Sequence, residues 1–390
     1  MAGVSFALAD FVTGGPILDL PVMKGASWSA QLNRPDELTC KVDMRDPDAL
    51  ALDLPSSSEP RKTVLLARTD DDVILAWGVI GDRTWDEDKR TLELSAAGVL
   101  SSYFGKTIIA PSSALTAALL TTDAEGYPIV NPALDTTFTG FSLGTIGKKL
   151  IAQRLAWPGA PIPFDLPADE IAPADESHTR TYLFASLKSI GSALQDLMGV
   201  ENGPDFAFDA QRASDGISLR YVMRHGTEAR PRIGTDIGAW SLGQVSPITG
   251  LKITDDGDTI ASAAWLTAGR SSGAALLSRA RNDSLVTASG YPPLDAVDTS
   301  HSDVSVPATL DAYARELIRY SAAMTRDVSF TVRADASPAL GQYRPGDTVT
   351  LDVPEDHPYL SSSIPIRITS ISGDESGKTV KVGCVVLDGS

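Results

Sequence analysis

Cysteine and histidine are scarce in this chain of 390 residues, which contains two cysteines, Cys40 and Cys384, and four histidines. Two cysteines cannot form a disulfide framework or the cysteine cluster of a structural zinc site. The histidines are scattered, and none has a second histidine three or four residues away, as a helical metal site requires. We therefore expect no metal or other cofactor, two buried free thiols, and histidines at the surface or in turns.

Basic residues are fewer than acidic ones. The chain contains 33 Lys and Arg and 50 Asp and Glu, which gives a net charge of −17 and an isoelectric point of about 4.6. Binding nucleic acid needs clustered Lys and Arg, so this balance argues against a surface that grips phosphates. Solubility is the simplest interpretation of the acidity. A second interpretation is that a ring of such subunits surrounds a channel that repels DNA and lets it slide through.

Long apolar runs are also missing. No segment approaches the ~18 apolar residues of a membrane span, and the first residues lack the charged region and apolar core of a signal peptide. We therefore expect a protein that is made in the cytoplasm and stays soluble or joins a particle assembled there. The hydrophobic content of 43% is ordinary, and the length suffices for two or three domains with sizeable cores.

What the sequence does contain is a strong β-pattern, shown best by residues 73–109. Apolar residues alternate with smaller ones from Val73 to Val79, a charged reversal follows, and residues 92–96 alternate again. This period of two predicts a hairpin with one buried face. Further alternating segments predict strands at residues 4–8, 28–32, 37–42 and 63–67. Residues 45–60, rich in Asp, Pro and Ser, predict a loop.

Helical spacing replaces this alternation in the middle of the chain. Apolar residues recur every three or four positions over residues 141–155, with Ser142 as the N-cap. A second helix is predicted to end near Gly199, and a hairpin is predicted over residues 204–223. We take residues 106–240 as a middle α+β domain with two helices.

The β-pattern returns after residue 240. One helix interrupts it over residues 307–324, where Pro307 suits the first turn. A turn containing Pro345 and Gly346 leads into an alternating strand, and residues 366–387 predict a closing hairpin. Other strand candidates are residues 249–254, 260–266, 284–288 and 327–333. The predicted domains are residues 1–105, 106–240 and 241–390.

The hairpin of residues 73–109 also resembles a known family. Its first strand contains Trp-Gly-Val-Ile, and after the acidic turn it reads Leu-x-Leu-x-Ala-x-Gly-Val-Leu-Ser-Ser-Tyr. This pattern is similar to the first barrel of the tail-hub or baseplate-hub proteins of long-tailed bacteriophages, which include the late-control D proteins. The chain's ending, a helix, a strand, a Pro-Gly-Asp turn and two closing strands, resembles the second barrel of that family. The resemblance is weakest over residues 111–180.

The resemblance implies a mainly β fold with an α+β insertion, in which two small, tail-tube-like β-barrels, residues 1–105 and 241–390, flank the middle domain. It also implies a structural virion protein, not an enzyme: a homotrimeric hub at the tail tip that caps the sixfold tail tube and adapts it to threefold symmetry. Its partners would be the tail tube or distal tail protein above and tail-tip or fibre proteins below. DNA would pass through the lumen without specific binding, and the hub would organise the host-attachment apparatus.

Two rival functions rest on residue patterns. Residues 269–273 read Gly-Arg-Ser-Ser-Gly, formally the nucleophile motif of a serine esterase or peptidase with Ser271 as the nucleophile, and Asp295 and His301 follow in hydrolase order. That motif needs a parallel sheet with intervening helices, whereas the flanking pattern indicates an antiparallel meander, so we prefer a small-residue loop. The six tryptophans could instead line the sugar cleft of a carbohydrate-binding host-recognition module, although such isolated aromatics more often fill cores or interfaces.

Two further motifs have simple interpretations. Residues 373–379 resemble a phosphate-binding loop, but only three residues separate the glycines where the motif needs four, and no helix can follow so near the end, so we predict a hairpin turn. The three aspartates of residues 70–72 lack calcium-loop spacing and are interpreted as a solvated turn. We name no catalytic, cofactor-binding or metal-binding residue.

Overall fold

The computed structural model describes residues 3–159, 161–171, 178–243, 246–271, 274–301, 304, 306–322, 325–360 and 363–387. Strands account for 42% of the chain and helices for 19%, so the predicted mainly β fold with an α+β insertion is confirmed. Over the ranges just given, no helix is both long and apolar enough to cross a membrane.

The first part of the chain is a meander of strands with short helices between them. Its strands are β1 (Val4–Asp10), β2 (Leu18–Leu20), β3 (Ser27–Gln31), β4 (Glu37–Asp43), β5 (Thr63–Thr69), β6 (Ile74–Asp86) and β7 (Thr91–Ala97). The predicted loop over residues 45–60 is wrong, because it contains α1 (Pro47–Ala51) and α2 (Leu54–Ser57). Asp46 caps α1 by accepting a hydrogen bond from the backbone of Asp48, and Pro47 occupies the first turn. A third short helix, α3 (Val99–Ser102), follows the meander.

The middle part contains the two predicted helices and the predicted hairpin. Its elements are β8 (Leu120–Thr122), β9 (Pro128–Val130), β10 (Thr136–Phe141), α4 (Leu143–Leu155), β11 (Phe164–Asp165), β12 (His178–Tyr182), α5 (Ile190–Met198), β13 (Phe206–Arg212), β14 (Leu219–His225) and β15 (Asp236–Ser241). Ser142 caps α4 as predicted, since its hydroxyl accepts the N–H of Thr145. β13 and β14 pair antiparallel as the predicted hairpin.

The last part combines strands of the main sheet with a separate small sheet. Its elements are β16 (Ile248–Asp256), β17 (Ala263–Ser271), β18 (Ala274–Arg281), α6 (Asp283–Thr287), β19 (Asp295–His301), α7 (Pro307–Tyr320), β20 (Thr325–Arg333), β21 (Thr348–Asp352), β22 (Ile364–Asp374) and β23 (Thr379–Val386). The predicted strand at residues 284–288 is wrong, because these residues form α6, which buries Leu285. The β22–β23 turn confirms the hairpin interpretation of residues 373–379.

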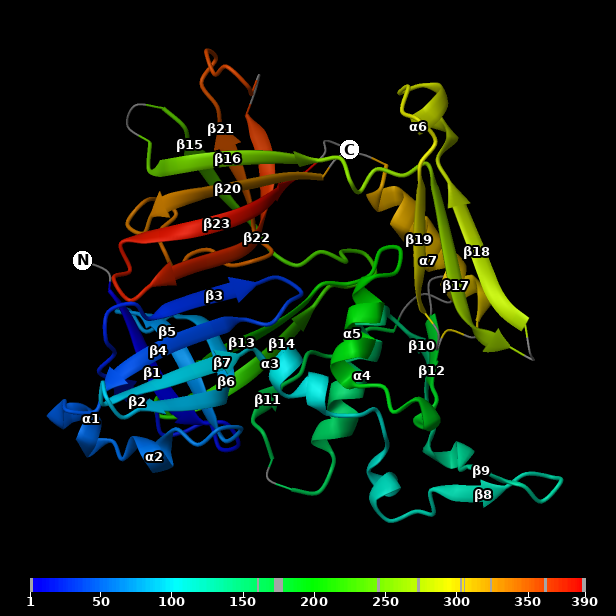
Figure 1. Ribbon diagram of the computed structural model, residues 1–390, viewed down its shortest axis with the longest axis horizontal. Coiled ribbons are helices and arrows are strands. Elements are labelled where there is room, and N and C mark those ends of the chain that lie inside the picture. Colours follow the sequence, from blue (N-terminus) through cyan, green and yellow to red (C-terminus); the bar gives the residue numbers. More distant parts are fainter. Residues whose placement is uncertain are drawn as a thin grey trace.

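One sheet runs through both ends of the chain (Figure 1). Within the described ranges it has thirteen strands, and its main path is β16-β20-β23-β22-β3-β4-β7-β6-β5-β1-β2, with β21 joined to β22 and β15 to β21. The two halves meet where β22 pairs antiparallel with β3. No sheet of the described residues closes into a barrel, so the two predicted barrels are not confirmed.

The core explains why some strands are apolar on both faces. In β5, Leu65 and Ala67 belong to a core between the two halves of the sheet, whereas Val64 and Leu66 face a second core with α4, α5 and α7. All four side chains are completely buried. Burying a valine or leucine contributes ~2 kcal/mol, so this near-continuous apolar run joins the two cores.

Candidate functional site at the domain junction

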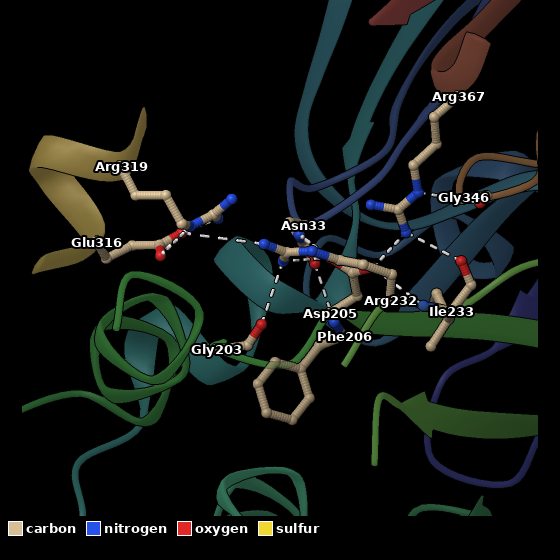
Figure 2. A network of polar contacts seen from close by, with 10 residues as sticks. All are labelled: Asn33, Gly203, Asp205, Phe206, Arg232, Ile233, Glu316, Arg319, Gly346 and Arg367. Carbon is tan, nitrogen blue, oxygen red and sulfur yellow. Dashed lines mark hydrogen bonds and ion pairs between the residues drawn. The ribbon is translucent and has the colours of Figure 1, made fainter. Parts of the chain in front are cut away.

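The buried carboxylate of Asp205 lies where the three parts of the chain meet (Figure 2). Asp205, at 0% exposure, precedes β13. One of its oxygens accepts hydrogen bonds from the side-chain amide of Asn33 (2.7 Å) and from Arg232 Nη1 (3.4 Å). The other accepts the backbone N–H of Ile233 (3.0 Å) and an N–H of Arg367. This carboxylate therefore bonds to residues from the first, middle and last parts of the chain.

Asn33 supplies the contact from the first part of the chain. It lies in the turn between β3 and β4 with a φ of 58°, a left-handed conformation that asparagine tolerates better than most residues. Its side-chain oxygen also accepts the backbone N–H of Phe206 at 2.9 Å. Both ends of one amide group thus hold the turn against the start of β13.

Arg367 supplies the contact from the last part. It points inward from β22 and is 9% exposed. Its guanidinium donates to the backbone oxygens of Gly346 (3.2 Å) and Ile233 (2.9 Å) in addition to the Asp205 carboxylate. A buried guanidinium is tolerated only when its donors find such partners.

The network continues to α7 through Arg232 (Figure 2). Arg232 donates to the backbone oxygen of Gly203 at 3.1 Å, and its second terminal nitrogen lies 4.0 Å from a carboxylate oxygen of Glu316. Glu316 is buried on α7 and holds Arg319 through hydrogen bonds of 2.9 and 2.6 Å. The helix is thereby attached to the same junction.

The Pro-Gly-Asp turn packs directly beside this network. The carboxylate of Asp347 accepts the backbone N–H of Thr235 and that of Arg344, each at 2.9 Å. Gly234 has a φ of 114°, and a Cβ on it would lie 2.1 Å from the backbone oxygen of Gly346. The two backbones can approach this closely only because residue 234 is glycine.

A cavity of ≈ 500 Å³ lies between the first part of the chain and the β13–β14 hairpin. Asp36 lines it and accepts the backbone N–H groups of Gln31 (3.2 Å) and Trp77 (3.3 Å). Burial, together with a smaller contribution from the negative charge of Asp209, raises the pKa of the Asp36 carboxyl to about 8. Asp209 is itself paired with Arg224 at 2.5 Å.

The residues of the serine triad that was considered as an alternative are not brought together. Ser271 ends β17, within a hairpin with β18 rather than at a turn from strand to helix, and residues 272 and 273 lie outside the described residues. Asp295 pairs with Ala263 at the other end of β17, eight residues from Ser271, which is roughly 25 Å along a strand. Asp295 accepts the indole N–H of Trp265 at 2.8 Å. The esterase arrangement is therefore not formed.

His301 has partners of its own. Its Nε2 lies 3.1 Å from the carboxylate of Asp298, and its ring stacks on Tyr313 with 4.0 Å between the centroids. Of the other histidines, His178 pairs with Glu228 at 3.2 Å, and Nδ1 of His225 lies 2.8 Å from the backbone oxygen of Gly226. Within the described ranges, no group of three or more His, Cys, Asp or Glu side chains is arranged to hold a metal ion.

The remaining motifs have structural roles. In the acidic turn of residues 70–72, Asp72 pairs with Arg68 and Arg212, and Asp70 accepts the backbone N–H of Gly3 at 2.9 Å. Cys40 and Cys384 are buried free thiols, as predicted. Among the tryptophans, Trp28, Trp77 and Trp240 are buried in the two cores, whereas Trp85 is 45% exposed. The side chains expected in a sugar cleft are therefore dispersed.

Sequence reasoning missed the junction residues. Asn33 and Asp205 are 172 positions apart, and Asp205 and Arg367 are 162 apart, so no local spacing connects them. The one available signal was Arg367 itself, an arginine between two isoleucines in a strand of the predicted closing hairpin. A charged residue at such a position requires a buried partner.

Comparison with known proteins places this fold among phage tail proteins. The sequence matches no protein-family model and no curated protein. Among solved structures, it is similar to a tail protein from Neisseria meningitidis MC58, with 14% identity and a TM-score of 0.51 over 98% of this chain and 96% of that one. It is also similar to the 43 kDa tail protein of prophage MuSo2 from Shewanella oneidensis, with 14% identity and a TM-score of 0.53 over the same shares.

These similarities extend over nearly the whole length of each protein. The chain therefore has the fold of these two tail proteins, and the resemblance seen in the sequence is confirmed at the level of the fold.

Proposed function

We propose that this protein is a structural component of a phage-type tail, a homotrimeric hub at the tail tip that caps the tail tube and surrounds the path of the DNA. The observation that supports this proposal is the fold, which matches two tail proteins across 96% of their lengths. In this proposal the protein acts by position and shape, without catalytic turnover. The partners are the tail tube or distal tail protein above and tail-tip or fibre proteins below.

The continuous sheet supports a ring-forming role. Its main path ends at β2 and β16, and strands at such edges leave backbone groups that a neighbouring subunit can pair. The halves are joined by β3–β22 pairing and by the Asp205 network, so they would keep a fixed angle. Three copies of two rigidly joined halves would give six β-modules, the number needed to face a sixfold tube.

The acidic composition fits passage of DNA. With a net charge of −17 per chain, a ring would repel the phosphate backbone over a range of about 8 Å at physiological ionic strength. Repulsion prevents tight binding, and DNA would then move through the lumen without specific contacts.

Electron microscopy of the purified protein tests this proposal. The expected image is a threefold ring with six β-lobes around a central hole. Isolated single particles without a hole at every concentration would contradict it. Treatment with a serine-reactive phosphonate addresses the esterase alternative, and we expect equal, background labelling of the natural protein and of Ser271→Ala. Selective loss of label in Ser271→Ala would instead favour the esterase.

A further inference from the structure

The hairpin of β8 and β9 projects from the body of the protein (Figure 1). We call residues 115–131 the arm. β8 and β9 form a two-stranded sheet that pairs with no other strand among the described residues. An isolated two-stranded hairpin is at best marginally stable in water, so the arm would gain stability from a surface that covers it.

The arm nevertheless has a well-defined internal structure. At its base, Asn131 donates from its side chain to the backbone oxygen of Ala118 and from its backbone to that of Leu119, both at 2.9 Å. At its tip, the Asp123 carboxylate accepts the backbone N–H groups of Glu125 (3.1 Å) and Tyr127 (2.7 Å). The arm is thus a formed element that presents its side chains in a fixed order.

Those side chains are unusually apolar for an exposed hairpin. Of the twenty large hydrophobic residues that are exposed within the described ranges, six lie in the arm: Leu115, Leu119, Leu120, Tyr127, Ile129 and Val130. Leu120 and Val130 are direct cross-strand partners and share one face. The arm also contains two acids, Asp123 and Glu125, and no Lys, Arg or His. Exposed apolar surface concentrated in this way marks an interaction site.

A face with complementary properties occurs on the small sheet β18-β17-β19. One side of this sheet packs on α7, where Leu266 of β17 and Leu310 of α7 share a core. The opposite side exposes Leu277 at 65% and Val297 at 68%. Trp265 lies between them on the central strand. We call this opposite side the outer face.

The outer face also carries a positive charge at its centre. Arg279 is the strand partner of Trp265, and its guanidinium lies over the indole ring at 5.5 Å. The described residues give Arg279 no ion pair, whereas Arg281 beside it is paired with Asp283. An acidic side chain from another molecule can therefore meet Arg279 without displacing an existing carboxylate partner.

We propose that the arm of one copy docks on the outer face of a second copy of this chain. Apolar side chains of the arm would cover Leu277, Trp265 and Val297, and Glu125 would pair with Arg279. Among the described residues the arm pairs with no strand of the small sheet, and we assign the contact to two different molecules. Such a head-to-tail contact closes into a ring when its rotation permits. The inference rests on the proposed ring and assigns its subunit interface.

Cysteine crosslinking tests the docking. Ile129→Cys in the arm is combined with Leu277→Cys on the outer face, and the protein is treated with a short bis-maleimide. The natural thiols are buried, so the background is low. We expect covalent multimers that end at the trimer. The matched control pairs Ile129→Cys with Leu50→Cys, whose leucine is 59% exposed on α1, and this pair should stay monomeric on a denaturing gel.

The outcomes separate this proposal from the proposed hub. A native trimer that gives no arm-to-face crosslink overturns the docking and leaves the hub intact. Crosslinked species that stop at the dimer support the docking and contradict the trimer. A monomer without crosslinks at any concentration contradicts both. Equal crosslinking in the Leu50→Cys control overturns the docking, because the contact would then be unspecific.

A charge exchange gives an independent measurement. Glu125→Arg or Arg279→Glu alone should raise the dissociation constant of the oligomer about tenfold, because like charges then face each other at the contact. The double variant should restore association to near the natural value. Additive losses in the double variant would overturn the pairing of Glu125 with Arg279.

Discussion

At the scale of single residues, the most consequential group is the Asp205 carboxylate. It is fully buried, and it accepts hydrogen bonds from Asn33, near the start of the sequence, and from Arg367, near its end. A buried ion pair adds little net stability when compared with a well-packed apolar pair, because both charges lose their hydration. Removing only one partner, however, leaves an uncompensated charge in the interior.

We therefore expect Arg367→Met to lower the free energy of unfolding by ~3–5 kcal/mol, the usual cost of breaking a buried pair. Chemical denaturation monitored by tryptophan fluorescence measures it. Arg333→Met is the matched control, since Arg333 pairs with Asp335 at the surface and both side chains are more than half exposed. An exposed pair contributes ~0–1 kcal/mol. Equal losses in the two variants would show that the Asp205 network has no special role.

Asp36 makes stability depend on pH. Its pKa is about 8 in the folded protein against 3.8 for the ordinary carboxyl, so between these values the folded state holds a proton that the unfolded state has released. Stability from this group is complete below the unfolded pKa and is lost as pH rises through about 8. We expect Asp36→Asn, which cannot ionise, to show a smaller fall in melting temperature between about pH 5 and about pH 8.

The comparison with Asp36→Asn isolates this effect from other titrations. His225 acts in the opposite direction, because burial lowers its pKa and its contribution therefore grows as pH rises. That contribution is the same in both proteins and cancels in the difference. Parallel pH profiles of the two proteins would contradict a neutral Asp36 in the fold.

At the scale of elements, the packing of one turn against another fixes how the two halves of the main sheet meet. The backbone of Gly234 touches that of Gly346, and both glycines have positive φ angles. The pattern of the sequence identified the Pro-Gly-Asp turn but not the segment against which it packs. That contact depends on a residue more than one hundred positions away, which no local pattern contains.

We expect Gly234→Ala to destabilise the protein by ~2–4 kcal/mol, since a Cβ both strains the left-handed backbone and meets the Gly346 oxygen at 2.1 Å. Gly238→Ala is the control for backbone strain alone. Gly238 also has a positive φ, of 99°, but nothing lies within 4 Å of its Cβ position. Thermal unfolding of both variants measures the difference, and equal melting temperatures would refute the close approach.

Local patterns predicted many elements because their causes are local. The strands of the first part, α4 with its Ser142 cap, α5 and α7 follow from alternation, helical spacing and capping. The prediction of a strand at residues 284–288 was wrong. A short apolar run is compatible with either a strand or a helix, and these residues form the helix α6, which buries Leu285. Local patterns also failed to identify β8 and β9, whose apolar residues cover no core of their own chain.

At the scale of the whole molecule, the two ends of the chain share one sheet and one core. Trp28 from the first part and Trp240 near the last part both belong to the core between the halves. Pairing of β3 with β22 makes the sheet continuous. The segments on either side of the predicted boundaries at residues 105 and 240 therefore share a sheet and a core, so the fold of each depends on the others.

This dependence predicts cooperative unfolding. Differential scanning calorimetry should give one main transition in which both halves of the sheet melt together, with the calorimetric enthalpy equal to the van't Hoff enthalpy. Two well-separated transitions, one for residues 1–105 and one for the last part, would contradict the shared core.

The central claim is the trimeric hub, and the native mass of the purified protein tests it most directly. Light scattering over a range of concentrations should find a species of three times the 41.1 kDa chain mass. The same measurement on Glu125→Arg should show dissociation at higher concentrations than the natural protein. A mass of 41.1 kDa at every concentration would contradict the account.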